Sequence, residues 1–232
     1  MITKAAVNLQ SLRVEIGGYR IALFQAAFAA RGLMFPHVRR LIVSPSNHYM
    51  VDHCPHTTIL AGSDRYGPFK DPNIELVERA ATLSDLECFA LRTSWDGTLL
   101  KVLAETDMKV RTLLIPGTLG LHLTYEALAE PLSLLPSVKV LSIPGISELH
   151  AGFEPSDDDN TENSAQKRRE AEERVAAFIF DRCPGLKELW FDQATKAIRK
   201  QEERGGSRGV SNAGLVWSRG DEIETPAWAG LI

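Results

Sequence analysis

The chain has 232 residues, of which 44% are hydrophobic and 24% are charged, and this composition is typical of a globular protein. Its 26 basic and 30 acidic side chains give a formal net charge of -4, so no overall positive field is available to hold a nucleic acid. Neither a signal peptide nor an apolar run of roughly 18 residues is present, and we expect a cytoplasmic or nuclear protein without a membrane or nucleic-acid partner.

One short pattern recurs along the chain: an apolar residue, two residues, an apolar residue, one residue and a third apolar residue. The first copy is Leu9-x-x-Leu12-x-Val14. Six copies occur, and their first residues are Leu9, Val38, Leu86, Val110, Val138 and Leu186. Successive copies begin 24 to 48 residues apart, and each of the two 48-residue intervals leaves room for a degenerate copy or a long insertion.

The residues around each copy indicate a strand that starts at a turn. Proline stands two positions before the first apolar residue in three copies, at Pro36, Pro136 and Pro184. Proline ends a preceding helix and favours an extended chain. The residue after the first apolar position is always polar: Gln10, Arg39, Glu87, Arg111, Lys139 and Lys187. We therefore predict six parallel strands, centred near residues 12, 41, 89, 113, 141 and 189.

Helical patterns fill the intervals between the strand patterns. Residues 19–31 carry apolar side chains at helical spacing, and Gly32 follows as a C-cap. Asp71 and Asp96 each precede an apolar run, as is typical of a helix start. Residues 165–182 begin with charges and then present an apolar stripe. Each strand and its helix leave an apolar face that only neighbouring units can cover.

This alternation predicts an α/β fold, a leucine-rich-repeat-like solenoid with a parallel sheet on the concave side and helices outside. Residues 1–232 form a single repeat domain in this interpretation. Residues 153–166 form an acidic insertion, which we expect to be disordered because its composition buries little apolar surface. Residues 200–212 form a polar linker before a closing strand around Val216.

The repeated units resemble the leucine-rich-repeat-like region of fungal F-box proteins. The resemblance covers residues 8–192, and its clearest segments read FPHVRRLIV, LPSVKVLSI and RVAAFIFDRCPGLKELWF. In that family the repeats present a substrate to a ubiquitin ligase, and an N-terminal F-box makes the link to the ligase. A repeat begins here by Leu9, which leaves no room for an F-box of ~40–50 residues, a size well within a small domain.

The predicted sheet places one residue of each copy on the side away from the helices, because alternate side chains of a strand point to opposite faces. These residues are Arg13, Ile42, Ala90, Leu114, Ser142 and Trp190. We predict a partner-binding set from this face, namely Arg13, Ile42, Arg92, Leu114 and Trp190. Tryptophan and arginine dominate interface hot spots, so Trp190 is the expected anchor. The alternative is that the helices or the C-terminal tail cover this face.

Catalytic motifs are absent: the sequence contains no G-x-S-x-G elbow, no Walker loop and no G-x-G-x-x-G. The densest group of metal-ligating residues is His48, His53, Cys54 and His56, whose spacing matches no common zinc pattern. Cys88 and Cys183 are typical of small structural side chains. We therefore expect a non-catalytic protein-interaction scaffold without a cofactor. A metal-dependent enzyme with a site near His48–His56, or a fragment without independent function, remains the alternative.

Overall fold

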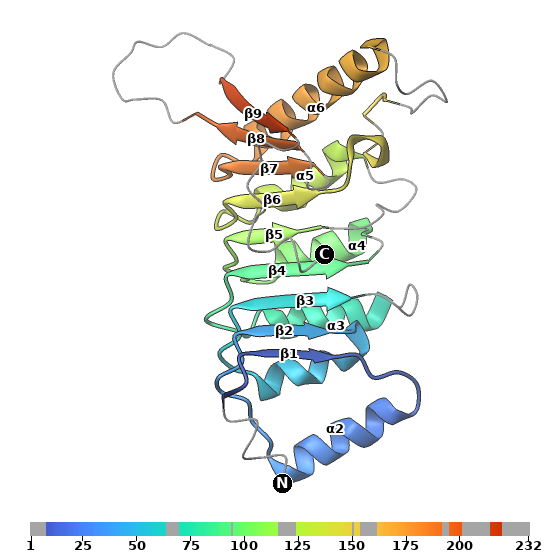
Figure 1. The fold of residues 1–232 in the computed structure, drawn as a ribbon, viewed down its shortest axis with the longest axis vertical. Coiled ribbons are helices and arrows are strands. Elements are labelled where there is room, and N and C mark those ends of the chain that lie inside the picture. The colour runs from blue at the N-terminus through green and yellow to red at the C-terminus, as the bar shows by residue number, and fades with distance from the viewer. Residues whose placement is uncertain are drawn as a thin grey trace.

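In the part of the chain that the structure describes, nine strands form one sheet and follow one another across it in chain order (Figure 1). The strands are β1 (Ser11–Val14), β2 (Arg40–Val43), β3 (Ile59–Ser63), β4 (Cys88–Arg92), β5 (Thr112–Leu114), β6 (Val140–Ile143), β7 (Glu188–Phe191), β8 (Thr195–Arg199) and β9 (Leu215–Arg219). This computed structural model describes residues 8–63, 70–93, 95–115, 124–149, 151–153, 162–191, 195–200 and 214–219.

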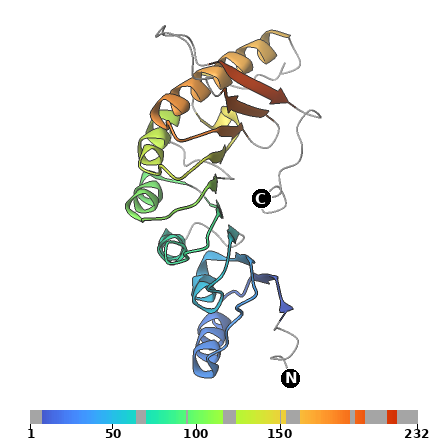
Figure 2. The ribbon, with the colours of Figure 1, turned by 90° about the vertical axis from the view of Figure 1, so that its left-hand side faces the viewer.

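The described helices all lie on one face of this sheet (Figure 2). The α-helices are α2 (Arg20–Arg31), α3 (Lys70–Ala80), α4 (Gly97–Glu105), α5 (Tyr125–Ser133) and α6 (Glu162–Arg182). Two 3-10 helices, η2 (Pro45–His53) and η3 (Ile146–Glu148), follow β2 and β6. The protein is therefore an α/β protein with helices on one side of a mostly parallel sheet.

The prediction of six parallel strands is confirmed. β1 to β7 pair in parallel, β8 pairs antiparallel with β7, and β9 pairs antiparallel with β8. The second apolar residue of each copy lies in one row across the sheet and packs against the helices: Leu12, Leu41, Leu60, Phe89, Leu113, Leu141 and Leu189. All of this row except Leu12 is at most 1% exposed, which makes it the axis of the core.

A seventh parallel strand, β3, occupies the first of the two long intervals. It is a degenerate copy of the pattern, Thr57-x-x-Leu60-x-Gly62. Thr57 is buried, and its hydroxyl donates to the carbonyl of Cys54 at 2.9 Å, which offsets the cost of burying a polar group. At Gly62 a Cβ atom would lie 2.4 Å from Leu91 Cδ1, so the side chain of the next strand fills that place. At the first position of this copy, Thr57 therefore replaces an apolar residue, and at the third position Leu91 of the next strand fills the space beside Gly62.

Several helix predictions are confirmed at the residues that cap them. Gly32 adopts a left-handed conformation with φ of 55° at the end of α2. Asp96 accepts a hydrogen bond from the Leu99 amide at 2.9 Å, which caps α4. The helix α6 begins at Glu162, three residues earlier than expected, while α5 was not predicted from the sequence.

The predicted insertions fall largely outside the described residues. Residues 154–161 of the acidic insertion are not among them, and residues 162–166 form the first turn of α6 rather than a disordered segment. Residues 201–213, which include most of the polar linker, also lie outside the described part of the chain. The closing strand is present as β9, and Val216 lies within it.

Candidate protein-interaction face

The sheet register brings the predicted row of side chains together. Backbone pairing places them side by side across seven strands, in the order Arg13, Ile42, Ala61, Ala90, Leu114, Ser142 and Trp190. Their neighbours along each strand belong to the core under the helices, so this row lies on the opposite side of the sheet. We call this row the middle row and the surface that it crosses the non-helical face.

The N-terminal part of the non-helical face is accessible to a partner. The Arg13 side chain is 51% exposed, and its Nη2 lies 2.7 Å from Glu15 Oε1. The Ser63 hydroxyl donates to the same carboxylate oxygen at 2.8 Å. Ile42 is half-buried and Arg92 is exposed. Ile42 thus lies beside Arg13, which is paired with Glu15, and two strands from Arg92, and this combination suits a protein partner with apolar and acidic groups.

The C-terminal part of the face is closed to solvent, which corrects one expectation. Leu114 is 0% and Trp190 is 2% exposed, so neither side chain is an exposed anchor in this structure. The Trp190 indole donates to Glu188 Oε2 at 3.3 Å, and Lys196 Nζ lies 4.8 Å from its ring centroid. Of the two alternatives, an open face or a covered one, burial favours the covered face around these two residues.

Two further residues belong to this face: the sequence placed Cys88 at an outward position of its strand but left it out of the partner-binding set, and it missed Ala61. Ala61 and Cys88 join Ala90, Leu114 and Trp190 in a buried apolar cluster that is separate from the core under the helices. Ala61 was missed because its strand is the degenerate copy. Cys88 stands two residues before Ala90, so period-two alternation alone places it on the same face. The alternation was the available signal for Cys88, and only the pairing of β3 supplies Ala61.

The four residues of the predicted metal alternative do not converge on one point. His48 Nε2 lies 2.7 Å from Glu75 Oε2. His53 Nδ1 lies 2.6 Å from the carbonyl oxygen of Leu33, and His56 Nδ1 lies 3.0 Å from Asp85 Oδ2. Among the described residues, no group of three or more His, Cys, Asp or Glu side chains is arranged to hold a metal ion. Each histidine therefore joins a different local contact.

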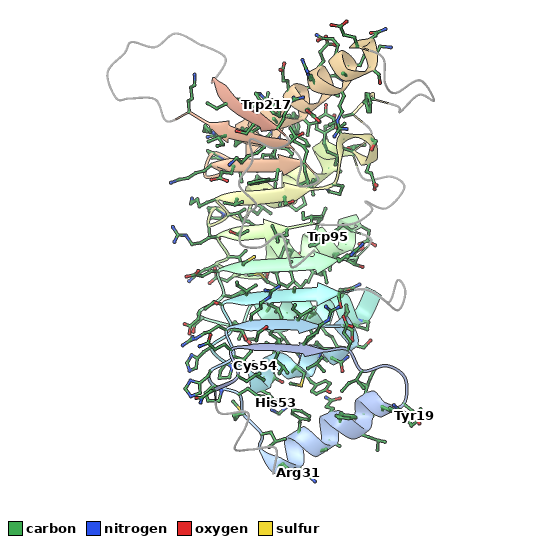
Figure 3. The ribbon with its side chains drawn as sticks, in the orientation of Figure 1. Tyr19, Arg31, His53, Cys54, Trp95 and Trp217 are labelled. Carbon is green, nitrogen blue, oxygen red and sulfur yellow. The ribbon has the colours of Figure 1, made fainter. Side chains whose placement is uncertain are left out.

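The surroundings of His48 and Cys54 explain these separate roles. Burial is the main effect that lowers the pKa of His48, and it outweighs the opposing effect of Glu75. Burial also raises the pKa of the Cys54 thiol to about 12, so this thiol stays protonated at neutral pH. Cys54 is 0% exposed within the core under the helices, while His53 packs edge-on against Phe28 of α2 (Figure 3). His48 and His53 therefore contact α3 and α2, and they help to hold η2 against these two helices.

Comparison with known proteins leaves the chain without an assigned relative. No protein family model, no curated protein and no solved structure matches it. Over the residues that the structure describes, no helix combines the length and apolar character needed to span a bilayer. The functional interpretation therefore depends on the geometry of the non-helical face.

Proposed function

We propose that the protein is a leucine-rich-repeat-like solenoid that acts as a non-catalytic protein-interaction scaffold. Seven parallel strands in chain order, with the described helices on one side, support the repeat interpretation. On the other side, the accessible part of the non-helical face, around Arg13, Ile42 and Arg92, offers a surface rather than a pocket, and such surfaces suit macromolecules.

The observation that carries this proposal is the composition of the accessible part of the non-helical face. Arg13 and Arg92 are exposed there, and Ile42 lies between them in the sheet order. Arginine contributes disproportionately to interface hot spots because its guanidinium makes several directed hydrogen bonds over an apolar stem. We therefore propose that Arg13, Ile42 and Arg92 contact the partner directly.

The resemblance to fungal F-box proteins supports a narrower form of the proposal. In that form the non-helical face recognises the substrate of a ubiquitin ligase. The measurement that checks it is the half-life of a bound partner in cells with and without this chain. A substrate would persist longer when the chain is depleted. An unchanged half-life would remove the ligase interpretation and leave the scaffold proposal standing.

The scaffold proposal is tested by comparing variants of the immobilised protein for the partners that they retain. We expect Arg13→Ala and Arg92→Ala each to weaken binding of a specific partner at least about tenfold, equivalent to ~1.4 kcal/mol. The matched control is Arg169→Ala, an exposed arginine of α6 on the helical side, which should leave binding unchanged. Equal losses in all three variants, or no loss in the first two, would contradict the proposed site.

A further inference from the structure

The middle row of the non-helical face is buried along most of its length. From β3 to β7 its side chains are Ala61, Ala90, Leu114, Ser142 and Trp190, and none is more than 3% exposed. A side chain of a sheet has neighbours on its own strand and on both adjacent strands, but its outer end stays open unless another segment lies on it. Every described helix lies on the other face (Figure 2). The nine described strands therefore do not explain this burial by themselves.

The two alanines of the middle row indicate how closely any group that covers this face must approach the backbone of the sheet. Ala61 and Ala90 are each 1% exposed, although their side chains rise only one carbon above the sheet. Next to them Ile42 and Ile59 are half-buried, so taller neighbours on one side do not close the surface completely. A bulky apolar group that descends almost to the backbone at β3 and β4 would exclude water from both alanines.

We propose that the C-terminal segment, residues 220–232, docks on the non-helical face and covers the middle row. These residues lie outside the described part of the chain, and they follow β9 at the end of the sheet. Five interstrand steps of ~4.8 Å separate β9 from β4, or about 24 Å. Trp228 is nine residues beyond Arg219, which corresponds to about 30 Å of extended chain. The segment is therefore long enough to place Trp228 over the alanines.

The order of chemical groups in the segment matches their order on the face. Acidic residues come first after β9, and an apolar group follows: Asp221, Glu222, Glu224, then Ala227, Trp228, Ala229, Leu231 and Ile232. On the face, Lys196 of β8 comes first, and the apolar Trp190 and Leu114 follow toward β4. Acids beside Lys196 are complementary in charge, and apolar residues on Trp190 and Leu114 are complementary in hydropathy, while Glu188 on the same face accepts the Trp190 indole N–H.

This docking gives the face a built-in competitor, a consequence that rests on the proposed function. A partner that binds only Arg13, Ile42 and Arg92 can occupy the exposed part of the non-helical face without displacing the segment. A partner that extends toward Leu114 and Trp190 must first displace residues 220–232. The apparent affinity of such a partner is then reduced by the fraction of molecules in which the segment is bound. Removal of the segment would strengthen that binding.

The reactivity of Cys88 reports whether the segment covers the face. Cys88 is 7% exposed in the buried cluster of the non-helical face, and burial raises the pKa of its thiol to about 12. Cys54 is the internal control, because its thiol pKa is also about 12 but it lies in the core under the helices. The rate of alkylation by N-ethylmaleimide would be measured at each cysteine by peptide mass spectrometry. Uncovering Cys88 lowers its pKa and speeds its reaction, because the thiolate is the reactive form.

Three variants are compared with the complete chain: one that ends at Arg219, one with Trp228→Ala, and one with Leu121→Ala. Leu121 lies in residues 116–123, another segment outside the described residues, and it represents a competing occupant. We expect Cys88 to react at least about tenfold faster in the shortened chain and several-fold faster in Trp228→Ala, with Cys54 unchanged. A peptide of residues 220–232 added to the shortened chain should restore protection.

The outcomes separate docking from general loosening. If both cysteines react faster in the shortened chain, the truncation has destabilised the whole protein. The rates of Cys88 and Cys54 in Trp228→Ala then show whether the segment covers the face. The proposal is overturned if Trp228→Ala leaves Cys88 unchanged, if it accelerates Cys54 and Cys88 equally, or if Leu121→Ala alone exposes Cys88. No partner takes part in this experiment, so failure to find a binding partner would count against the proposed function and not against the docking.

Discussion

The two ends of the sheet differ in how much of their surface is buried. At the N-terminal end, β1 has a strand neighbour on one side only among the described residues, and α2 contains no buried residue. Large apolar side chains are exposed there: Tyr19, Leu23, Phe24 and Met34. Phe24 is exposed, although Phe28 of the same helix packs against Phe35, Tyr49 and His53. Tyr19 and Arg31 mark the two ends of this outermost helix in Figure 3.

The C-terminal end is closed by an antiparallel pair of strands and by charges. Glu172 of α6 is 0% exposed and contacts Arg168 of its own helix at 3.0 Å. Its other oxygen lies 2.8 Å from Arg219 of β9, close enough for an ion pair although not aligned as a hydrogen bond. Trp217 of β9 stacks on Phe191 with ring centroids 6.2 Å apart (Figure 3). Helix and sheet are therefore joined at this end by both packing and charge.

The difference shows what ends a stack of strand–helix units. Each inner unit buries its apolar face against two neighbours, so an end unit has one face left to cover. The C-terminal end covers it with β8, which runs antiparallel to β7, and with β9, whose Trp217 and Arg219 contact Phe191 and Glu172. The N-terminal end keeps the geometry of an inner unit and leaves apolar side chains in solvent. Local stability should accordingly rise from β1 toward β9.

The largest expected effect tests this gradient within one row of the core. Leu12 of β1 and Leu189 of β7 occupy the same register position, but Leu12 is partly exposed and Leu189 is 0% exposed. We expect Leu189→Ala to lower the free energy of unfolding by about 4 kcal/mol and Leu12→Ala by about half as much, because the cost follows the atoms removed from a packed core. Urea denaturation measures both. Equal losses would show that the two ends are packed alike.

A somewhat smaller effect is expected from the buried carboxylate of the C-terminal end. Glu172→Gln removes the charge that Arg168 and Arg219 contact, and we expect a loss of about 3 kcal/mol in the free energy of unfolding. The adjacent Glu173 is exposed, so Glu173→Gln is the matched control and should change stability by less than about 0.5 kcal/mol. If Glu172→Gln proves neutral, packing alone closes this end of the sheet.

The open end should tolerate a substitution that the closed end would not. Leu23 of α2 is 64% exposed, and we expect Leu23→Gln to change the free energy of unfolding by less than about 0.5 kcal/mol. A loss above about 1.5 kcal/mol would mean that this face of α2 is covered in solution. Sedimentation of the purified protein at several concentrations would then show whether a second copy provides the cover. That result would remove the contrast between the two ends.

The smallest effect concerns the pH dependence of the region beside α2. Burial lowers the pKa of His48 below 6.5, so the unfolded chain takes up a proton before the folded one as the pH falls. The free energy of unfolding should therefore decrease below about pH 6.5, and His48→Gln should remove part of that decrease. His37 is exposed and its substitution by Gln is the control. Urea denaturation at about pH 7.5 and about pH 5.5 compares them. If His48→Gln leaves the decrease in the free energy of unfolding unchanged, that decrease comes from carboxylates and not from His48.

Some features follow from the order of residues alone. The apolar pattern with a period of two places Leu12, Leu41 and Leu189 on one face and Arg13, Ile42 and Trp190 on the other, whatever lies around them. The capping residues Gly32 and Asp96 act within one helical turn. Such signals depend on neighbours in sequence, so they could be recognised before the fold was known.

Other features exist only because distant segments meet. The strand β3 lacks two of its three apolar residues, and only Leu91 of the next strand shows why Gly62 is sufficient there. The burial of Leu114 and Trp190 depends on what lies over the sheet, and the separate contacts of His48 and His56 depend on α3 and on the turn before β4. Local chemistry thus determined six of the parallel strands and which of their side chains share a face. Tertiary packing decided which part of that face is exposed, because exposure depends on surrounding segments far away in the sequence.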